Sequence, residues 1–177
     1  SRIAESVCHH AAEYMIESGL DPKLFRIMDD CTFMMEMKNA GGYASEIADR
    51  LNGRKLFKRA LYADIHSVNS DVFKFRKNTK RIENEIAQSA GIDQGYVLVD
   101  IPEKSEIVEM KAQVIINGKM IPIDKASNLV ASLEKAQLDN WRIGVFTPPE
   151  YREKVGNIAR EFFEVKKDIK QFKLTDI

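Results

Sequence analysis

The segment from Val114 to Ile123 constrains the fold more than any other stretch of the sequence. Two apolar runs flank Asn117-Gly118, and this dipeptide tolerates the positive φ values that a type I′ turn requires. The segment therefore predicts a β-hairpin. Because the two strands of a hairpin run in opposite directions, we expect antiparallel pairing in the sheet to which they belong.

The first third of the chain has helical periodicity. Apolar residues recur on one helix face over residues 3–15. Asp21-Pro22 is typical of a helix start, and the second helix is expected to run to Gly41-Gly42. A third, short helix is expected over residues 44–51, where Asn52-Gly53 ends it.

From residue 56 onward, predicted strands alternate with predicted helices. We expect a strand at 56–63, a helix at 72–90, a strand at 96–101, the hairpin, a helix through Leu129 and Leu133, a strand at 141–146 and a helix over 151–162. Thr147 and Glu150 have the spacing of a capping box for the last helix. This order predicts an α+β fold, in which an N-terminal helical segment precedes a ferredoxin-like antiparallel sheet backed by helices.

The change of pattern also predicts a division of the chain. We expect a helical segment over residues 1–53, an α+β domain over residues 54–164 and a lysine-rich tail over residues 165–177. The tail is expected to form a final helix or a frayed end.

Composition limits the compartment and the partners. The 27 basic and 27 acidic residues give no net charge, whereas a domain built to hold nucleic acid is usually more basic. Cys8 and Cys31 are too few for a disulfide framework, so we expect a reducing compartment and a cytoplasmic protein. No apolar run has the length of a membrane span, so no membrane partner is expected.

The sequence predicts no catalytic residue and no metal ligand in this chain. His9 and His10 are adjacent, so on a helix they point about 100° apart and cannot bind one ion together. His66 lies far from both along the chain. The Asp29-Asp30 pair has no third ligand at a suitable spacing, so a helix-cap or salt-bridge role is expected.

The segment from Arg50 to Arg59 is the best candidate for binding a ligand. If the chain is extended from Arg54, then Arg54 and Lys58 lie on the same side and reach one polyphosphate. The planar fork of Arg and the point charge of Lys suit phosphate oxygens. The alternative, which the pattern alone favours, is an ordinary solvated basic turn.

The motif Arg54-x-Leu56-Phe57-Lys58 resembles the Arg-x-Leu-Phe/Tyr-Lys segment of the HD-type deoxynucleoside triphosphate (dNTP) triphosphohydrolases. This family includes the SAM-and-HD-domain enzyme of animals. Further segments resemble the family in the same order, namely residues 24–30, 96–100, 121–124 and 141–151.

The resemblance implies the carboxy-terminal part of a metal-dependent hydrolase of this family. The metal-binding His, His-Asp pair and Asp of the HD domain would precede Ser1. The chain is therefore expected to be a fragment that is inactive alone and holds no cofactor, with the divalent metal in the missing HD domain.

The resemblance also implies what the fragment does. Arg54 and Lys58, with Arg26, are expected to bind the phosphates of an activating nucleotide at a subunit interface. The expected partners are other copies of the chain, in a homo-oligomer, and a nucleoside triphosphate effector. The function implied is regulation and oligomerisation of the nucleotide phosphohydrolase.

Two other functions are open on the sequence. The first is a structural dimerisation module without a ligand. The second, less favoured, is nucleic-acid binding through the lysine-rich tail and a basic helix face. This face consists of Arg76, Lys77, Lys80 and Arg81.

Overall fold

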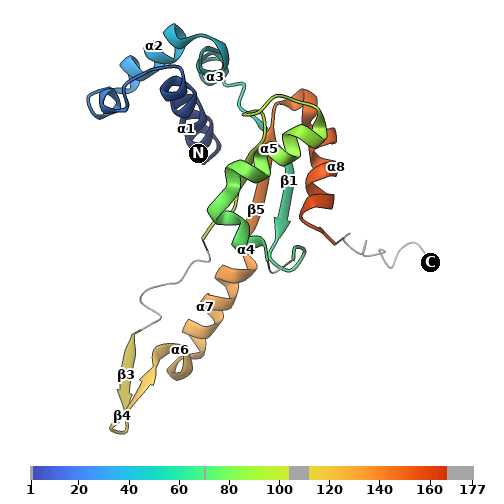
Figure 1. Ribbon diagram of the computed structural model, residues 1–177. Coiled ribbons are helices and arrows are strands. Elements are labelled where there is room, and N and C mark those ends of the chain that lie inside the picture. The colour runs from blue at the N-terminus through green and yellow to red at the C-terminus, as the bar shows by residue number, and fades with distance from the viewer. Residues whose placement is uncertain (1, 70, 104–111, 167–177) are drawn as a thin grey trace, which may run out of the picture.

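The computed structural model describes residues 2–69, 71–103 and 112–166 (Figure 1). Three helices come first: α1 (Arg2–Glu17), α2 (Asp30–Ala40) and α3 (Gly42–Asn52), with the 3-10 helix η1 (Pro22–Arg26) between α1 and α2. The Asp29 carboxylate accepts a hydrogen bond from the backbone N–H of Thr32 at 2.7 Å and so caps α2, as expected. Gly41, with φ 70°, separates α2 from α3.

The second half alternates strands and helices. The elements are β1 (Lys58–Asp64), α4 (Val72–Phe75), η2 (Arg76–Asn78), α5 (Thr79–Ala90), β2 (Leu98–Asp100), β3 (Gln113–Ile116), β4 (Lys119–Pro122), α6 (Ile123–Ala126), α7 (Asn128–Asp139), β5 (Arg142–Thr147), η4 (Pro149–Tyr151) and α8 (Arg152–Phe162). The predicted α+β class, with N-terminal helices followed by an antiparallel sheet backed by helices, is confirmed. Within the described ranges, none of these helices combines the length and apolar character needed to cross a bilayer.

The main sheet has three strands in the order β1-β5-β2. β5 pairs antiparallel with both neighbours, and Val145 lies opposite Leu61 on one side and Val99 on the other. An irregularity between Arg59 and Leu61 bends β1. The last strand in the chain is therefore the centre of the sheet.

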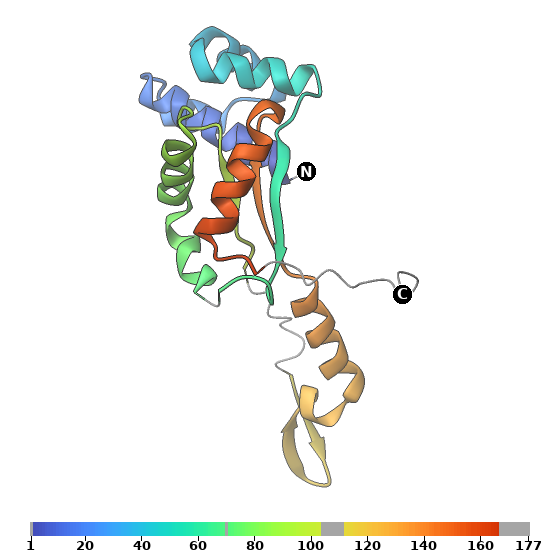
Figure 2. The same cartoon turned by 90° about the vertical axis from the view of Figure 1, so that its right-hand side faces the viewer.

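The two faces of the main sheet belong to two different cores. Leu61, Val99 and Val145 pack with residues of α5 and α8, and Figure 2 shows α8 lying along the strands. Leu98 and Phe146, on the opposite face, pack with the buried residues of α1, α2 and α3. The N-terminal helices are therefore fixed to the sheet by its second face.

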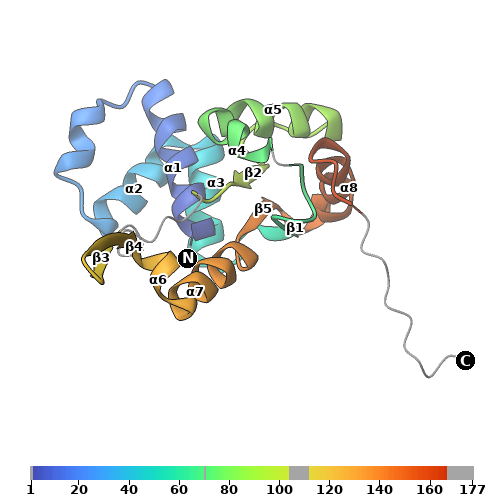
Figure 3. The ribbon, with the colours of Figure 1, turned by 90° about the horizontal axis from the view of Figure 1, so that it is seen from below.

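The hairpin has the predicted turn but does not pair with the main sheet. Asn117 and Gly118 have φ values of 52° and 76°, as a type I′ turn requires. We expected the hairpin to join the main sheet, but β3 and β4 form a separate two-stranded sheet. In Figures 1 and 3, this sheet lies apart from the main sheet, together with α6 and α7. The Asn-Gly signal is local, so it determines the turn but not the next strand.

The capping box predicted at Thr147 is wrong. Thr147 is the last residue of β5, and its buried hydroxyl has no hydrogen-bond partner among the described residues. Glu150 instead accepts a hydrogen bond from Arg50 at 3.4 Å. The Glu150 side chain therefore bonds with Arg50 of α3 and not with the nearby backbone amide that a capping box requires.

The predicted division of the chain at residues 53 and 164 stays a prediction. The predicted tail beyond Lys166 lies outside the described residues.

Gly156 in α8 allows this helix to approach β1 closely, and its substitution tests the packing. A Cβ atom added at Gly156 would lie 2.8 Å from the carbonyl oxygen of Ala60. Alanine normally favours a helix over glycine by about 1 kcal/mol. Here we expect the opposite sign: Gly156→Ala lowers the free energy of unfolding by about 1–3 kcal/mol, because α8 must move away from β1.

Urea denaturation followed by circular dichroism measures this change. The control is Glu153→Ala, at an exposed position of the same helix, which should stay within about 0.5 kcal/mol of wild type. A Gly156→Ala variant as stable as the wild type contradicts the close contact between α8 and β1.

Candidate functional site

Helix α3 ends in a Schellman motif whose left-handed position is occupied by Arg54. The backbone N–H of Lys55 donates to the carbonyl oxygen of Arg50 at 2.7 Å, and that of Arg54 donates to Leu51 at 3.1 Å. Arg54 has φ 53°, whereas Gly53 has φ −80°. The glycine therefore stands one residue before the position that favours it. The left-handed conformation of Arg54 costs about 1–2 kcal/mol.

The junction between α3 and β1 presents cations to solvent. Arg54, Lys55 and Lys58 are exposed, and none of them forms an ion pair with a carboxylate of the described residues. Arg59 differs, because its guanidinium lies 3.8 Å from the ring centroid of Tyr62. Three cations with no acidic partner in this part of the chain are thus available to an anion.

The expected extended chain from Arg54 is wrong. Arg54 is left-handed and belongs to the turn, and the strand begins only at Lys58. Strand alternation therefore does not place Arg54 and Lys58 on a common side. What joins them is a short junction with one cation at each end.

Phe57 fixes this junction to the body of the protein. Its side chain is 2% exposed, and its ring stacks on Tyr96 with a centroid distance of 6.3 Å and an interplanar angle of 18°. The guanidinium carbon of Arg50 lies 5.7 Å from the Phe57 centroid. Lys58 is thus held immediately after a buried anchor.

Arg50 lies one helical turn before Arg54 and is already paired. Its Nε donates to Oε1 of Glu46 at 2.7 Å and its Nη2 to Oε1 of Glu150 at 3.4 Å. Burial disfavours its charge, but the hydrogen bond and charge of Glu46 outweigh burial and raise the pKa of Arg50. Arg50 therefore joins α3 to η4 as a permanent cation.

Tyr96 bonds with the second carboxylate oxygen of Glu46. Its hydroxyl donates to Oε2 of Glu46, and its ring meets that of Tyr43 edge-on at 5.6 Å. Burial, followed by the hydrogen bond to Glu46, raises the pKa of Tyr96 above its ordinary value. The phenol therefore remains a hydrogen-bond donor at neutral pH.

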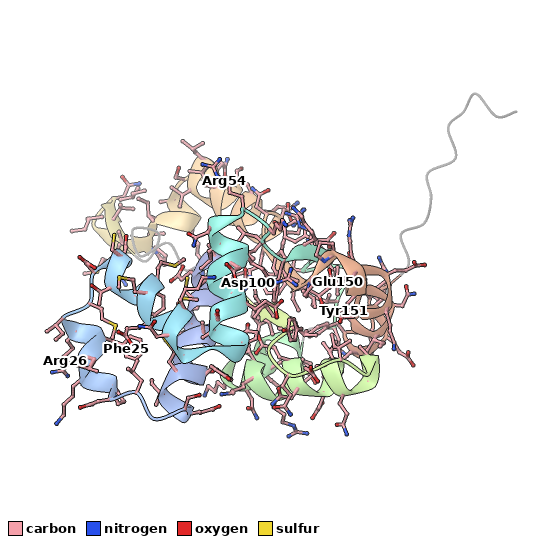
Figure 4. The ribbon with its side chains drawn as sticks, turned by 90° about the horizontal axis from the view of Figure 1, so that it is seen from above. Phe25, Arg26, Arg54, Asp100, Glu150 and Tyr151 are labelled. Carbon is pink, nitrogen blue, oxygen red and sulfur yellow. The ribbon has the colours of Figure 1, made fainter. Side chains whose placement is uncertain are left out.

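Arg26 does not meet the other two predicted site residues within one chain. It is the exposed last residue of η1. Figure 4 shows Arg26 and Arg54 well apart on the layer of N-terminal helices. The structure thus places Arg54 and Lys58 in one junction and Arg26 at a separate position.

The structure also contains an ionisable pair, a buried Glu83 and a half-buried His10, that the sequence did not reveal. Glu83 of α5 is 6% exposed. Its Oε1 accepts from the backbone N–H of Val99 at 2.8 Å, and its Oε2 lies 3.3 Å from Nε2 of His10 in α1. The pair borders a cavity of about 270 Å³ that Tyr14 and Tyr43 also line. No sequence spacing connects His10 with Glu83, because the two helices are far apart along the chain.

The described residues do not provide a metal site. No group of three or more His, Cys, Asp or Glu side chains in residues 2–69, 71–103 and 112–166 is placed to hold a metal ion. Asp29 serves as the cap of α2, and its hydrogen bonds with Thr32 lower its pKa. These residues therefore do not fit the divalent metal that the HD resemblance implies.

The basic helix face predicted as a nucleic-acid alternative is largely neutralised. Arg76 pairs with Glu103, and Arg81 pairs with Glu85 at 2.7 Å. Lys80 pairs with two carboxylates of α1, at 2.9 Å and 3.6 Å. These carboxylates compete with any phosphate for the same cations.

The sequence as a whole matches one protein family. A family model described as "HD associated region" matches residues 1–174. No curated protein and no solved structure matches the chain. The family match is not confined to the junction around Arg54, because it spans the N-terminal helices, both sheets and α8.

Replacing Tyr96 by Phe tests the arrangement around Glu46. The variant keeps the ring stack on Phe57 but removes the hydrogen bond to Glu46. We expect the free energy of unfolding at pH 7 to fall by about 1 kcal/mol. The pKa of Tyr96 is raised in the folded state, so its stabilisation is fully present below about pH 10 and is lost as the pH rises further.

The difference between wild type and Tyr96→Phe should therefore persist from neutral pH to about pH 9 and narrow above about pH 10. Urea denaturation at each pH measures it. The control is Tyr62→Phe, because Tyr62 is 50% exposed and its hydroxyl has no hydrogen bond among the described residues. Equal stability of Tyr96→Phe and wild type at pH 7 would rule out a stabilising role for the bond.

Proposed function

Because this chain belongs to the HD associated region family, we propose that it is the regulatory and oligomerisation region of an HD-type nucleotide phosphohydrolase. Arg54 and Lys58 bind the phosphates of a nucleoside triphosphate. The chain supplies no catalytic residue. Hydrolysis and the divalent metal belong to the HD domain.

The observation that carries this proposal is the left-handed conformation of Arg54. A residue with a bulky side chain rarely adopts φ 53°, and Gly53 immediately before it would satisfy the position at no cost if the chain were shifted by one residue. Strained backbone persists mainly where it places a side chain for function. The conformation of Arg54 is explained if the turn serves to present its guanidinium.

The charges around the junction support the same ligand. Arg54, Lys55 and Lys58 have no carboxylate partner among the described residues, and charge-assisted hydrogen bonds to phosphate are among the stronger polar contacts. Arg50 behind them is already bound by Glu46 and Glu150. In the site, Arg50 is thus held and neutralised by carboxylates, while the exposed cations in front of it are available to phosphate.

The position of Arg26 links binding to oligomerisation. Arg26 and Arg54 lie apart in one chain (Figure 4), so a nucleotide that contacts both must lie between two subunits. Such a ligand stabilises the assembly, and by thermodynamic linkage the assembly increases affinity for the ligand. Through this linkage, the nucleotide concentration would set the extent of assembly and so affect the HD domain.

Exposed apolar side chains in the N-terminal part of the chain favour a second candidate function, a dimerisation module without a ligand. They are Ile16, Leu24, Ile27 and Met35, which are 39%, 39%, 81% and 65% exposed. Sedimentation with and without a nucleoside triphosphate separates the two functions. A dimer whose sedimentation does not change when the nucleotide is added favours the dimerisation module without a ligand.

Arg54→Gly is the sharpest test of nucleotide binding, in the protein that joins this region to its HD domain. Glycine adopts φ 53° without strain, so the variant should unfold no more easily than wild type. A nucleoside triphosphate at about 100 times its Kd should stabilise the wild type by about 2.7 kcal/mol. We expect the resulting rise in melting temperature to be abolished by Arg54→Gly and reduced by Lys58→Ala.

The matched control is Lys77→Ala, because Lys77 is an exposed cation outside the junction, and it should keep the full shift. Arg26→Ala should reduce the shift only in the assembled protein. No shift in the wild type, or an equal shift in Arg54→Gly, contradicts the proposal.

A further inference from the structure

The hairpin and the two helices after it form a part of the molecule with no evident role so far. We call residues 113–139, which comprise β3, β4, α6 and α7, the arm. Figures 1 and 2 show the arm extending from one end of the main sheet, away from α1, α2 and α3. None of the side chains described between residues 112 and 140 is buried. The described arm therefore has no core of its own.

The hairpin is apolar on both faces. Ile115 lies directly opposite Met120, so their side chains share one face, and they are 73% and 69% exposed. Val114 lies opposite Ile121 on the other face, and both are half-buried. Strands that are apolar on both faces are typical of sheets covered on both sides. Among the described residues, one of the two covers is missing.

Helix α7 also has exposed apolar side chains. Leu129 and Leu133 are four residues apart, so they lie on one face of the helix. They are 70% and 52% exposed. Two pairs of large aliphatic side chains, one on the hairpin and one on α7, are thus open to solvent.

The end of α7, where the arm meets the body of the protein, is held by several contacts, although none of the described side chains of the arm is buried. Trp141 follows α7 and is 6% exposed. Its indole N–H donates to the carbonyl oxygen of Pro102 at 3.0 Å, and its ring centroid lies 4.9 Å from that of Phe73. Nε2 of His66 lies 3.0 Å from the Asp139 carboxylate. The end of α7 is therefore attached to the body by several contacts.

We propose that the arm is a dimerisation surface and that the arm of a second copy of this chain covers it. A two-stranded hairpin alone is marginally stable in water, whereas three or more strands with a covered apolar face are stable. Two copies supply four strands. A two-fold axis would also make the contact self-complementary and closed, whereas a contact between the arm and a different surface would close only as a ring.

Charge favours a second copy over other partners. Between residues 112 and 140 the sequence has three lysines and three carboxylates, so two arms do not repel each other. The same balance offers no attraction to nucleic acid or to an anionic membrane. A surface with exposed apolar side chains and no net charge is compatible with the interface of an obligate homodimer.

This inference rests on the oligomerisation part of the proposed function but not on nucleotide binding, so sedimentation equilibrium without nucleotide tests it. The wild-type chain should sediment at twice its mass of 20.2 kDa. Ile115→Glu and Leu129→Glu, at positions 73% and 70% exposed in the single chain, should fold normally and raise the dimer Kd by about 100-fold or more. Lys77→Glu, at an exposed position outside the arm, is the control and should remain dimeric.

Hydrogen exchange gives a second measurement that does not depend on the variants. Amides of β3 and β4 should become more protected as the concentration of wild-type chain rises. A wild type that is monomeric at every concentration overturns the proposal, as does a dimer that survives both arm substitutions or is lost in Lys77→Glu. None of these results bears on the nucleotide-dependent shift of Arg54→Gly, so the two proposals fail separately.

Discussion

The rest of the structure depends on the burial of β5 between two other strands. Five of its six residues are buried, and it pairs antiparallel with β1 and β2 at once. Val145 contributes to the core under α5 and α8, and Phe146 to the core of the N-terminal helices. β5 comes late in the chain, so β1 and β2 have no shared partner until it docks. Long-range contacts, rather than local turns, therefore hold the body together.

Features set by neighbouring residues could be predicted from the sequence, and features set by distant partners could not. The positive φ values of Asn117 and Gly118 and the cap at Asp29 each need only a few adjacent residues. The capping box failed because Glu150 has a guanidinium from α3 within reach, and no local rule indicates this. The hairpin likewise specified its own pairing, while its place outside the main sheet depended on the rest of the fold.

The candidate site shows the same division. The sequence identified Arg54 and Lys58 by their motif, but the expected geometry assumed an extended chain. Asn52-Gly53 predicted the end of α3, and glycine is the residue that most often takes the left-handed position after a helix. The structure puts Arg54 there instead, three residues before Phe57, which stacks on Tyr96. No spacing rule reveals this stacked anchor at the end of the junction.

β5 also separates the two surfaces for which functions are proposed. One end leads from the arm through Trp141, and the other leads to Glu150, which holds Arg50 of α3. A strand that is paired on both edges and covered on both faces has a single packed arrangement, so it acts as a rigid spacer and not as a switch. Energetic coupling requires an element with two arrangements. The two proposed functions, phosphate binding at Arg54 and association through the arm, are therefore expected to be independent within one chain. Under these proposals, coupling between them would arise only in an assembly in which a second subunit contributes Arg26 to the same nucleotide.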